Sequence, residues 1–300
     1  MGLYDSGVNV VTISTLLQTA LFGLQLGMTL VLITVGLTLI FGMMDVINIA
    51  HGSLYMLGAY FGLSLVAVTG NWWLALIIAP LLVALVGAAI EVFTIRPLYG
   101  RDPLYHILLT FGLALIVQGT VENIWGAEIR NVSIPSVLEG TLSLGIITYP
   151  TFRLFIMIIS VVVVAVIWIM FTQSEVGIIM RASAYDSDMV DALGIDVSRA
   201  FTGVFVFGAL LAGLAGVLLG TARAVSPAMG TDIIIQAFAI VVIGGLGSFR
   251  GAVLGAIAVG ILNAYGAVFL PTIVDILVFV LMAAVLLVKP SGLFGDPEAV

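Results

Sequence analysis

Apolar segments of about twenty residues alternate with short polar ones along nearly the whole chain. Their length matches the roughly 30 Å hydrocarbon core of a bilayer, where a helix satisfies its own backbone hydrogen bonds, so each is predicted to be a membrane-spanning helix. We expect these helices near Leu16–Phe41, Leu54–Val68, Trp73–Ile95, Tyr105–Asn123, Phe152–Phe171, Ala200–Ala222, Ile233–Gly245, Ala252–Leu270 and Ile273–Val288. The predicted fold is an all-α polytopic membrane protein, a bundle of about 8–10 transmembrane helices in a single domain over residues 1–300.

Composition agrees with this class and excludes several kinds of site. Hydrophobic residues make up 62% of the chain and charged residues 8%, whereas soluble domains carry about 25% charged residues. The absence of cysteine excludes disulfides and thiolate metal sites, and His51 and His106 are too few for a metal cage, so we expect no metal or other cofactor. A net charge of -7 disfavours nucleic acid as a partner.

A polar segment, residues 173–199, separates the fifth and sixth predicted spans. Its apolar and aromatic residues recur at the four and three spacing of one helix face. They are Ile178, Ala182, Tyr185, Met189 and Ala192. Ser183 and Asp186 have the spacing of a capping box, and Gly194 suits a left-handed residue at the helix end. Such a helix, about 15 Å long, is too short to span a membrane but long enough to present a face to a soluble partner; the alternative is a solvated loop without a partner.

Basic residues in the short connections predict the orientation. If segment 173–199 is cytoplasmic, the basic residues on the inside are Arg96, Arg101, Arg181, Arg199, Arg250 and Lys289, and those outside are Arg130, Arg153 and Arg223. The inside majority favours a short cytoplasmic helix in this segment. It also places the N-terminus outside and the C-terminus in the cytoplasm.

A second polar stretch lies inside the apolar pattern near residues 42–58. Asp45, Asn48 and His51 would be costly to hide in a continuous span, so a broken or re-entrant helix is predicted, as in many transport paths. On a helix continuing from Asn48, the side chains of Asn48, His51 and Tyr55 share one face, and we expect them to line the path. The alternative is an ordinary cytoplasmic turn in which Asn48 caps a helix.

Small residues recur every four positions in two late stretches of the chain. They are Gly208, Ala212, Gly216 and Gly220 in one, and Gly247, Gly251 and Gly255 in the other. Faces of this kind let two helix backbones approach closely. We expect a compact bundle.

Several of these runs carry a family resemblance. The run INIAHGSLYMLGAY (47–60), preceded by GLTLIFG (36–42), resembles the signature of LivH-type permeases of branched-chain amino acid ABC importers. The runs IRPLYGRDPL (95–104), ASAYDSDMVDALGIDVSR (182–199) and VVIGGLGSFRGAVLGA (241–256) fit the same family in the same order. The resemblance therefore covers nearly the whole chain.

The resemblance implies a non-catalytic, multi-pass permease subunit in the inner or plasma membrane. Its implied partners are a second related permease, two ATP-binding subunits and an extracytoplasmic substrate-binding protein, with ATP bound by the partner subunits alone. The implied solute is small and polar, in the first place a branched-chain or other amino acid, with urea or a short amide as the alternative. In such permeases the segment after the fifth span docks into a cleft of an ATPase subunit. Here the matching residues are Ala184, Tyr185, Asp186, Asp188, Met189, Ala192, Leu193 and Gly194.

A second function class, the ion-coupled secondary transporter, would use intramembrane acids as ion carriers. The candidates are Glu91, Glu122 and Asp275, which fall near predicted span ends without an evident basic partner. No GxxxxGK[ST] motif is present, so ATP must be hydrolysed by another chain. The short helical segment has no evident function in a stand-alone carrier, and we therefore favour the ABC permease.

Overall fold

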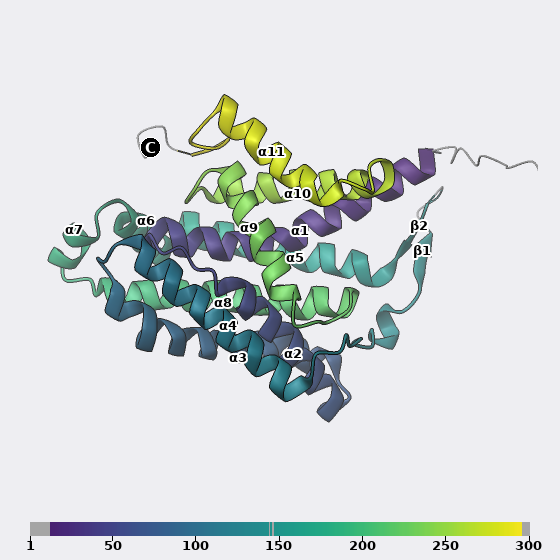
Figure 1. Ribbon diagram of the computed structural model, residues 1–300, viewed down its shortest axis with the longest axis horizontal. Coiled ribbons are helices and arrows are strands. Elements are labelled where there is room, and N and C mark those ends of the chain that lie inside the picture. The colour runs from purple at the N-terminus through teal and green to yellow at the C-terminus, as the bar shows by residue number, and fades with distance from the viewer. Residues whose placement is uncertain (1–12, 144, 146, 296–300) are drawn as a thin grey trace, which may run out of the picture.

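The computed structural model describes residues 13–143, 145 and 147–295 (Figure 1). Its α-helices are α1 (Ile13–Met44), α2 (His51–Thr69), α3 (Trp72–Ile90), α4 (Pro103–Trp125), α5 (Thr151–Gln173), α6 (Glu175–Tyr185), α7 (Ser187–Ala192), α8 (Val197–Ala222), α9 (Met229–Gly244), α10 (Phe249–Phe269) and α11 (Val274–Val288). A π-helical turn (Glu91–Ile95) and a 3-10 turn (Arg96–Leu98) follow α3, and a second 3-10 turn covers Ser136–Leu138. The antiparallel strands β1 (Thr141–Ser143) and β2 (Thr148–Pro150) form a hairpin before α5.

The predicted all-α polytopic fold is confirmed, and each of the nine predicted spans coincides with a helix. Within the described residues, seven helices are long and apolar enough to cross a membrane. The remaining two predicted spans correspond to α9 and α11, which are apolar but shorter. The N-terminus is predicted to lie outside and the C-terminus in the cytoplasm. The terminal residues themselves, 1–12 and 296–300, lie outside the described residues.

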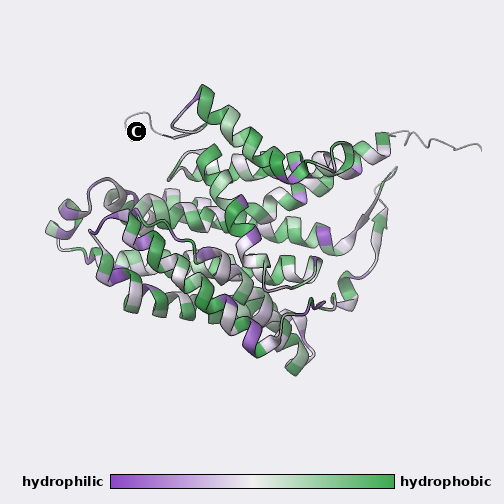
Figure 2. Ribbon diagram, in the orientation of Figure 1, coloured by the Kyte–Doolittle hydropathy of each residue, from purple (hydrophilic) through white to green (hydrophobic). Residues whose placement is uncertain are grey.

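Helices α1 and α8 form the centre of the bundle and are buried along most of their length. The outer helices instead expose large apolar side chains, such as Leu85 of α3, Ile116 of α4 and Leu287 of α11. Most helical residues are coloured hydrophobic in Figure 2, and several of the hydrophilic ones lie around α6 and α7. A soluble protein would hide such side chains, whereas lipid tails can cover them.

The predicted small-residue faces do bring backbones together. A Cβ atom built on Gly216 of α8 would overlap the carbonyl oxygen of Tyr55 in α2, and one on Gly251 of α10 would overlap the carbonyl of Gly244. Any side chain at these two positions would force the helices apart. The glycine spacing therefore sets the separation of α2 from α8 and of α9 from α10.

The chain between α1 and α2 returns into the middle of the bundle before helix resumes. His51, the first residue of α2, lies with Nε2 3.2 Å from the carbonyl oxygen of Ile33, and Met44 lies about 16 Å farther along α1 than Ile33. Residues 45–50 cover this distance without helical structure. The predicted break near residues 42–58 is thus confirmed, and a simple turn at the bundle surface does not describe it.

The start of α9 meets the start of α2 at this level. A Cβ atom on Gly52 would overlap the carbonyl oxygen of Gly230, so the first turns of the two helices touch through their backbones. From this contact α2 and α9 run toward opposite ends of the bundle (Figure 1). Two helices, α2 and α9, therefore begin in the interior and meet there at their first turns. Transporters use such an arrangement to build binding sites.

The bundle has two distinct ends, which we name by their local elements. The α7 end carries α6, α7 and the α3–α4 connection, and the hairpin end carries β1, β2 and the connection between α8 and α9 (Figure 1). At the hairpin end, Arg130 and Val225 form an isolated β-bridge that ties two loops together. The two ends differ in how they present charged and apolar residues.

Candidate transport path and docking surface

Segment 173–199 forms two helices rather than the single one predicted. Ser174 caps α6 by accepting from Gly177 N–H (3.1 Å), and Asp186 caps α7 by accepting from Met189 N–H (2.9 Å). The prediction that Ser183 starts the helix is wrong, because Ser183 lies buried inside α6, whose last turn also contains Ala184. Asp186 is extended and interrupts the helix one residue before Ser187.

The end of α7 agrees with prediction. Gly194 has φ +84°, the left-handed conformation that glycine adopts without steric cost. Its amide donates to the carbonyl of Asp191 (2.8 Å), which closes the last turn. The chain can then turn toward α8, which Asp196 caps by accepting from Arg199 N–H (3.0 Å).

Apolar side chains of this segment point away from the protein. Tyr185 is 95% exposed, Leu193 73% and Met189 59%, while Val190 is buried and anchors α7 to the bundle. We call the exposed set of Tyr185, Met189, Ala192 and Leu193 the α7 face. Asp188 is also exposed and flanks it. An apolar face bordered by acids at one end of a membrane bundle is the pattern of a helix that inserts into a partner's groove.

Glu91 is completely buried and paired. Arg96 donates to both of its carboxylate oxygens (Nε to Oε1 and Nη2 to Oε2, each 3.1 Å), and Tyr99 donates its hydroxyl to Oε1 (2.6 Å). Arg96 also donates to Thr202 in α8. Burial, together with the hydrogen bond to Glu91, raises the pKa of Tyr99 above its usual range, so the phenol stays a donor.

This pairing corrects the expectation that Glu91 lacks a basic partner. The π-helical turn places residues five apart on one side, which brings Arg96 onto Glu91. The other two acids differ: Glu122 is exposed and accepts from Gln118 (3.1 Å), and Asp275 lines a cavity. Among the described residues, no group of three or more His, Asp or Glu side chains is placed to hold a metal ion.

The three residues predicted to line the path, Asn48, His51 and Tyr55, do not lie on one helix face. Helix α2 begins at His51, so the prediction that Asn48 shares a helix face with His51 and Tyr55 is wrong for Asn48. Asn48 and His51 are both fully buried. Thr110 Oγ1 of α4 supports the non-helical backbone beside them, accepting from Ile49 N–H (3.1 Å). Tyr55, one turn into α2, lines a cavity.

That cavity, about 190 Å³, lies between α2, α8 and α9. Tyr55 forms one wall, and Arg223, Asp232 and Gln236 supply its charged and polar groups. The cavity lies beside the first turns of α2 and α9, in the region that the sequence predicts to be the transport path.

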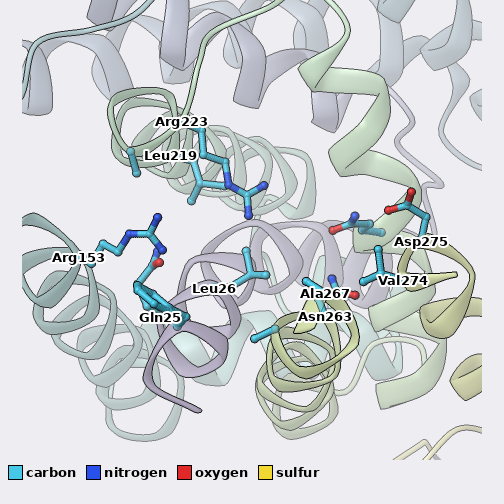
Figure 3. Close-up of a pocket in the computed structure, with 13 residues that line it drawn as sticks. Gln25, Leu26, Arg153, Leu219, Arg223, Asn263, Ala267, Val274 and Asp275 are labelled. Carbon is cyan, nitrogen blue, oxygen red and sulfur yellow. The ribbon is translucent and has the colours of Figure 1, made fainter. Parts of the chain in front are cut away.

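A larger cavity of about 310 Å³ adjoins it, with Leu219, Arg223 and Gln236 shared between the two. In Figure 3 the guanidinium groups of Arg153 and Arg223 both face this space, while Asn263 and Asp275 lie across from them. Gln25 of α1 extends toward Arg153 from below. Together the two cavities form a polar hollow in the hairpin half of the bundle.

Tyr149 supports the Arg153 side of this hollow. Its hydroxyl donates to the carbonyl of Leu21 (3.1 Å), and its ring packs on Phe22 with centroids 5.0 Å apart. Burial raises the pKa of Tyr149 to about 12, and the nearby Arg153 opposes that shift. The phenol therefore remains protonated and holds α1 against the strand that leads into α5.

Sequence reasoning did not identify the larger cavity. Asp275 was considered only as a candidate ion carrier, and Arg153 and Arg223 stand next to span ends, where charged residues normally meet water and give no signal of a site. Gln25 offers a weak signal, since it is a polar residue inside the first predicted span. Glu91 and Arg96 are five residues apart, a spacing that an α-helix does not bring together, so their pairing depends on the π-helical turn.

Comparison with known proteins now decides the family. Residues 19–286 match the family model described as branched-chain amino acid transport system / permease component. The chain belongs to this family. As a member of the branched-chain amino acid transport permease family, it is a multi-pass membrane permease component, and the predicted family is confirmed.

Individual relatives extend over almost the whole chain. It is 33% identical to the high-affinity branched-chain amino acid transport system permease protein BraD of Pseudomonas aeruginosa, over 94% of this chain and 96% of that protein. It is 32% identical to LivH of Salmonella typhimurium, a permease protein of the same description, over 94% and 96%. It is 30% identical to the probable branched-chain amino acid transport permease protein LivH of Methanocaldococcus jannaschii, over 89% and 88%.

Proposed function

We propose that this family member is one of two related permease subunits of an ABC importer that takes up branched-chain amino acids. The observation that carries the proposal is the exposed α7 face on a chain without a P-loop motif. A membrane bundle that cannot bind ATP through such a motif needs an external source of energy. The α7 face supplies a surface on which an ATPase can act, and the printed names of the relatives supply the substrate class.

The α7 face would insert into a groove on one of two ATP-binding subunits. Tyr185, Met189 and Leu193 provide the apolar contact, and Asp186 and Asp188 lie near the rim. Because α7 is joined to α8 by a short turn, movement of the ATPase would reach α8 directly, and through it the cavities at the hairpin end. The permease itself uses no cofactor in this scheme.

The α7 end would face the cytoplasm and the hairpin end the binding protein. Six basic residues gather at the α7 end and three at the hairpin end, in agreement with the positive-inside rule. Orientation can be tested in this cysteine-free chain with an impermeant maleimide on sealed cells. Ser136→Cys, in an exposed loop at the hairpin end, should react at once, and Ser198→Cys only after permeabilisation. The reverse order of labelling would overturn the orientation and the docking scheme.

The solute would cross between α2, α8 and α9 beside a second permease. Tyr55 lines the smaller cavity in this region, and the buried Asn48 and His51 shape the non-helical segment that leads into it. His51→Leu should slow uptake while leaving assembly intact. Unchanged uptake would remove His51 from the path.

Reconstitution tests the proposed function as a whole. The chain, its partner permease and the ATPases are purified together, placed in proteoliposomes and supplied with the cognate binding protein. We expect ATP-dependent, vanadate-sensitive uptake of leucine, isoleucine or valine, with hydrolysis stimulated by the loaded binding protein. Uptake driven by an ion gradient without ATP would contradict the proposal, and uptake of urea in place of amino acids would overturn its substrate.

A further inference from the structure

The two arginines of the larger cavity form no ion pair with any described carboxylate. Ion pairs among the described residues join Arg96 to Glu91 and Arg199 to Asp196, and no described carboxylate lies within 4.0 Å of Arg153 or Arg223. Yet both guanidinium groups face the same space (Figure 3). Two unpaired cations around one cavity attract an anion.

The surroundings of Arg153 favour a carboxylate. Its guanidinium carbon lies 4.5 Å from the ring centroid of Phe22, so one face of the group is covered by an aromatic ring. The N–H donors lie in the guanidinium plane and remain available at its edge. Arginine binds carboxylates through two parallel hydrogen bonds from this edge, which gives both affinity and orientation.

The rest of the lining favours a molecule that carries both a negative and a positive group over a simple anion. Asp275 and Asn263 lie across the cavity from the arginines (Figure 3) and offer oxygen acceptors suited to an ammonium group. The lining also contains apolar residues, among them Leu26, Ala264 and Val274. The cavity therefore offers sites for a carboxylate, an ammonium and an aliphatic chain.

We propose that this cavity is a binding site for the zwitterionic form of an aliphatic α-amino acid, with its carboxylate between Arg153 and Arg223 and its ammonium toward Asp275. The assignment rests on the proposed function, because it places the transported molecule in the hairpin half of the bundle. A volume of about 310 Å³ is at the small end of ligand pockets, which run from roughly 300 to 1,000 Å³. Arg223 also lines the smaller cavity, so it connects this site to Tyr55.

A cysteine reporter tests the site without the binding protein. Ala267 lines the cavity and is exposed, so Ala267→Cys in this cysteine-free chain should react with a small methanethiosulfonate reagent. We expect saturating L-leucine to slow the reaction several-fold in the purified permease pair. L-leucinamide, which keeps the ammonium and the side chain but has no carboxylate, should give no protection. Ser136→Cys, in a loop outside the cavity, is the matched control and should label at one rate throughout.

A second variant links the protection to the arginines. Adding Arg223→Gln to Ala267→Cys should weaken protection by leucine about tenfold or more, because a charge-assisted hydrogen-bond partner is lost. An unchanged labelling rate without leucine shows that the cavity is intact in this variant. Arg223→Lys keeps the charge but not the paired donors, and should lie between the two.

The outcomes separate this site from the proposed function. Absence of protection by leucine, or equal protection by leucinamide, overturns the site, even if the complete importer takes up leucine normally. Protection that survives Arg223→Gln unchanged also overturns it. Failure of the complete importer to take up any branched-chain amino acid overturns the proposed function instead, and that measurement uses the unmodified chain.

Discussion

The α7 end and the hairpin end treat charge in opposite ways. At the α7 end the buried acid, Glu91, is fully paired with Arg96 and Tyr99, and an exposed apolar face lies between exposed acids. At the hairpin end Arg153 and Arg223 line a cavity and form no ion pair with a described carboxylate. A surface of exposed apolar side chains suits a protein partner, whereas unpaired charges in a hollow suit a small charged molecule. The difference agrees with our proposal that energy input and solute binding occupy separate ends of one bundle.

Met189→Asp should have the largest effect on ATPase docking and leave the hairpin end unchanged. Burying Met189 in a partner contributes about 1.5–3 kcal/mol, and an aspartate would lose that term and bring a charge into the groove. We expect co-purification with the ATPases to fall at least tenfold, with loss of stimulated ATP hydrolysis. The cysteine reporter at the hairpin end should still be protected by leucine. Full hydrolysis and uptake in this variant would show that the α7 face is not the docking surface.

Arg96→Met should destabilise the α7 end from within. It leaves the buried carboxylate of Glu91 without its ion-pair partner, which costs about 1–3 kcal/mol of the free energy of unfolding. The double variant with Glu91→Gln removes the unpaired charge and should recover part of that loss. Thermal unfolding in detergent measures both. If the two substitutions simply add, the pair does not act as a unit.

Gly194→Val should disturb docking by a smaller amount. At φ +84° a β-branched residue is strained, by about 1–2 kcal/mol, so the end of α7 would shift while its apolar side chains remain. We expect partial uncoupling, seen as lower uptake for each ATP hydrolysed. Gly100→Val is a matched control, since Gly100 also has positive φ (+74°) but lies in the α3–α4 connection. Equal uncoupling by both variants would indicate general damage to the α7 end.

Asp188→Asn should have the smallest effect. Asp188 is exposed, and exposed ion pairs contribute only about 0–1 kcal/mol. Maximum uptake should stay near that of the unchanged chain, while the dependence of ATPase docking on salt concentration should become weaker. A loss as large as that of Met189→Asp would mean that charge, rather than apolar contact, holds the partner.

Local patterns of the sequence predict much of the fold. Long apolar runs locate all nine spans, and the polar residues near Asn48 reveal the break before α2. The glycine spacing of α8 predicts a close helix contact, which the structure shows with α2. Each of these features depends on residues within about one helix of one another, so a single stretch of sequence contains the necessary information.

The sites were harder to predict because they depend on distant parts of the chain. The larger cavity joins side chains of α1, α5, α8, α9, α10 and α11, and no local pattern indicates that Arg153 and Arg223 line the same space. The α7 face was predicted because its residues are neighbours in sequence, although the choice of Ser183 as cap was wrong. Both Ser183 and Asp186 are good caps, and only packing decides that Ser183 is buried.

The meeting of α2 and α9 in the interior also constrains how the chain is made. Residues 45–50 contact Thr110 of α4, and α2, which follows them, contacts Gly230 of α9. Residues 45–50 emerge from the ribosome long before either of these neighbours. Until those helices arrive, the non-helical backbone of this segment cannot enter lipid without unsatisfied polar groups. The first two helices must therefore wait in a sheltered or wet position during synthesis, and integration into the bilayer follows the order of packing rather than the order of translation.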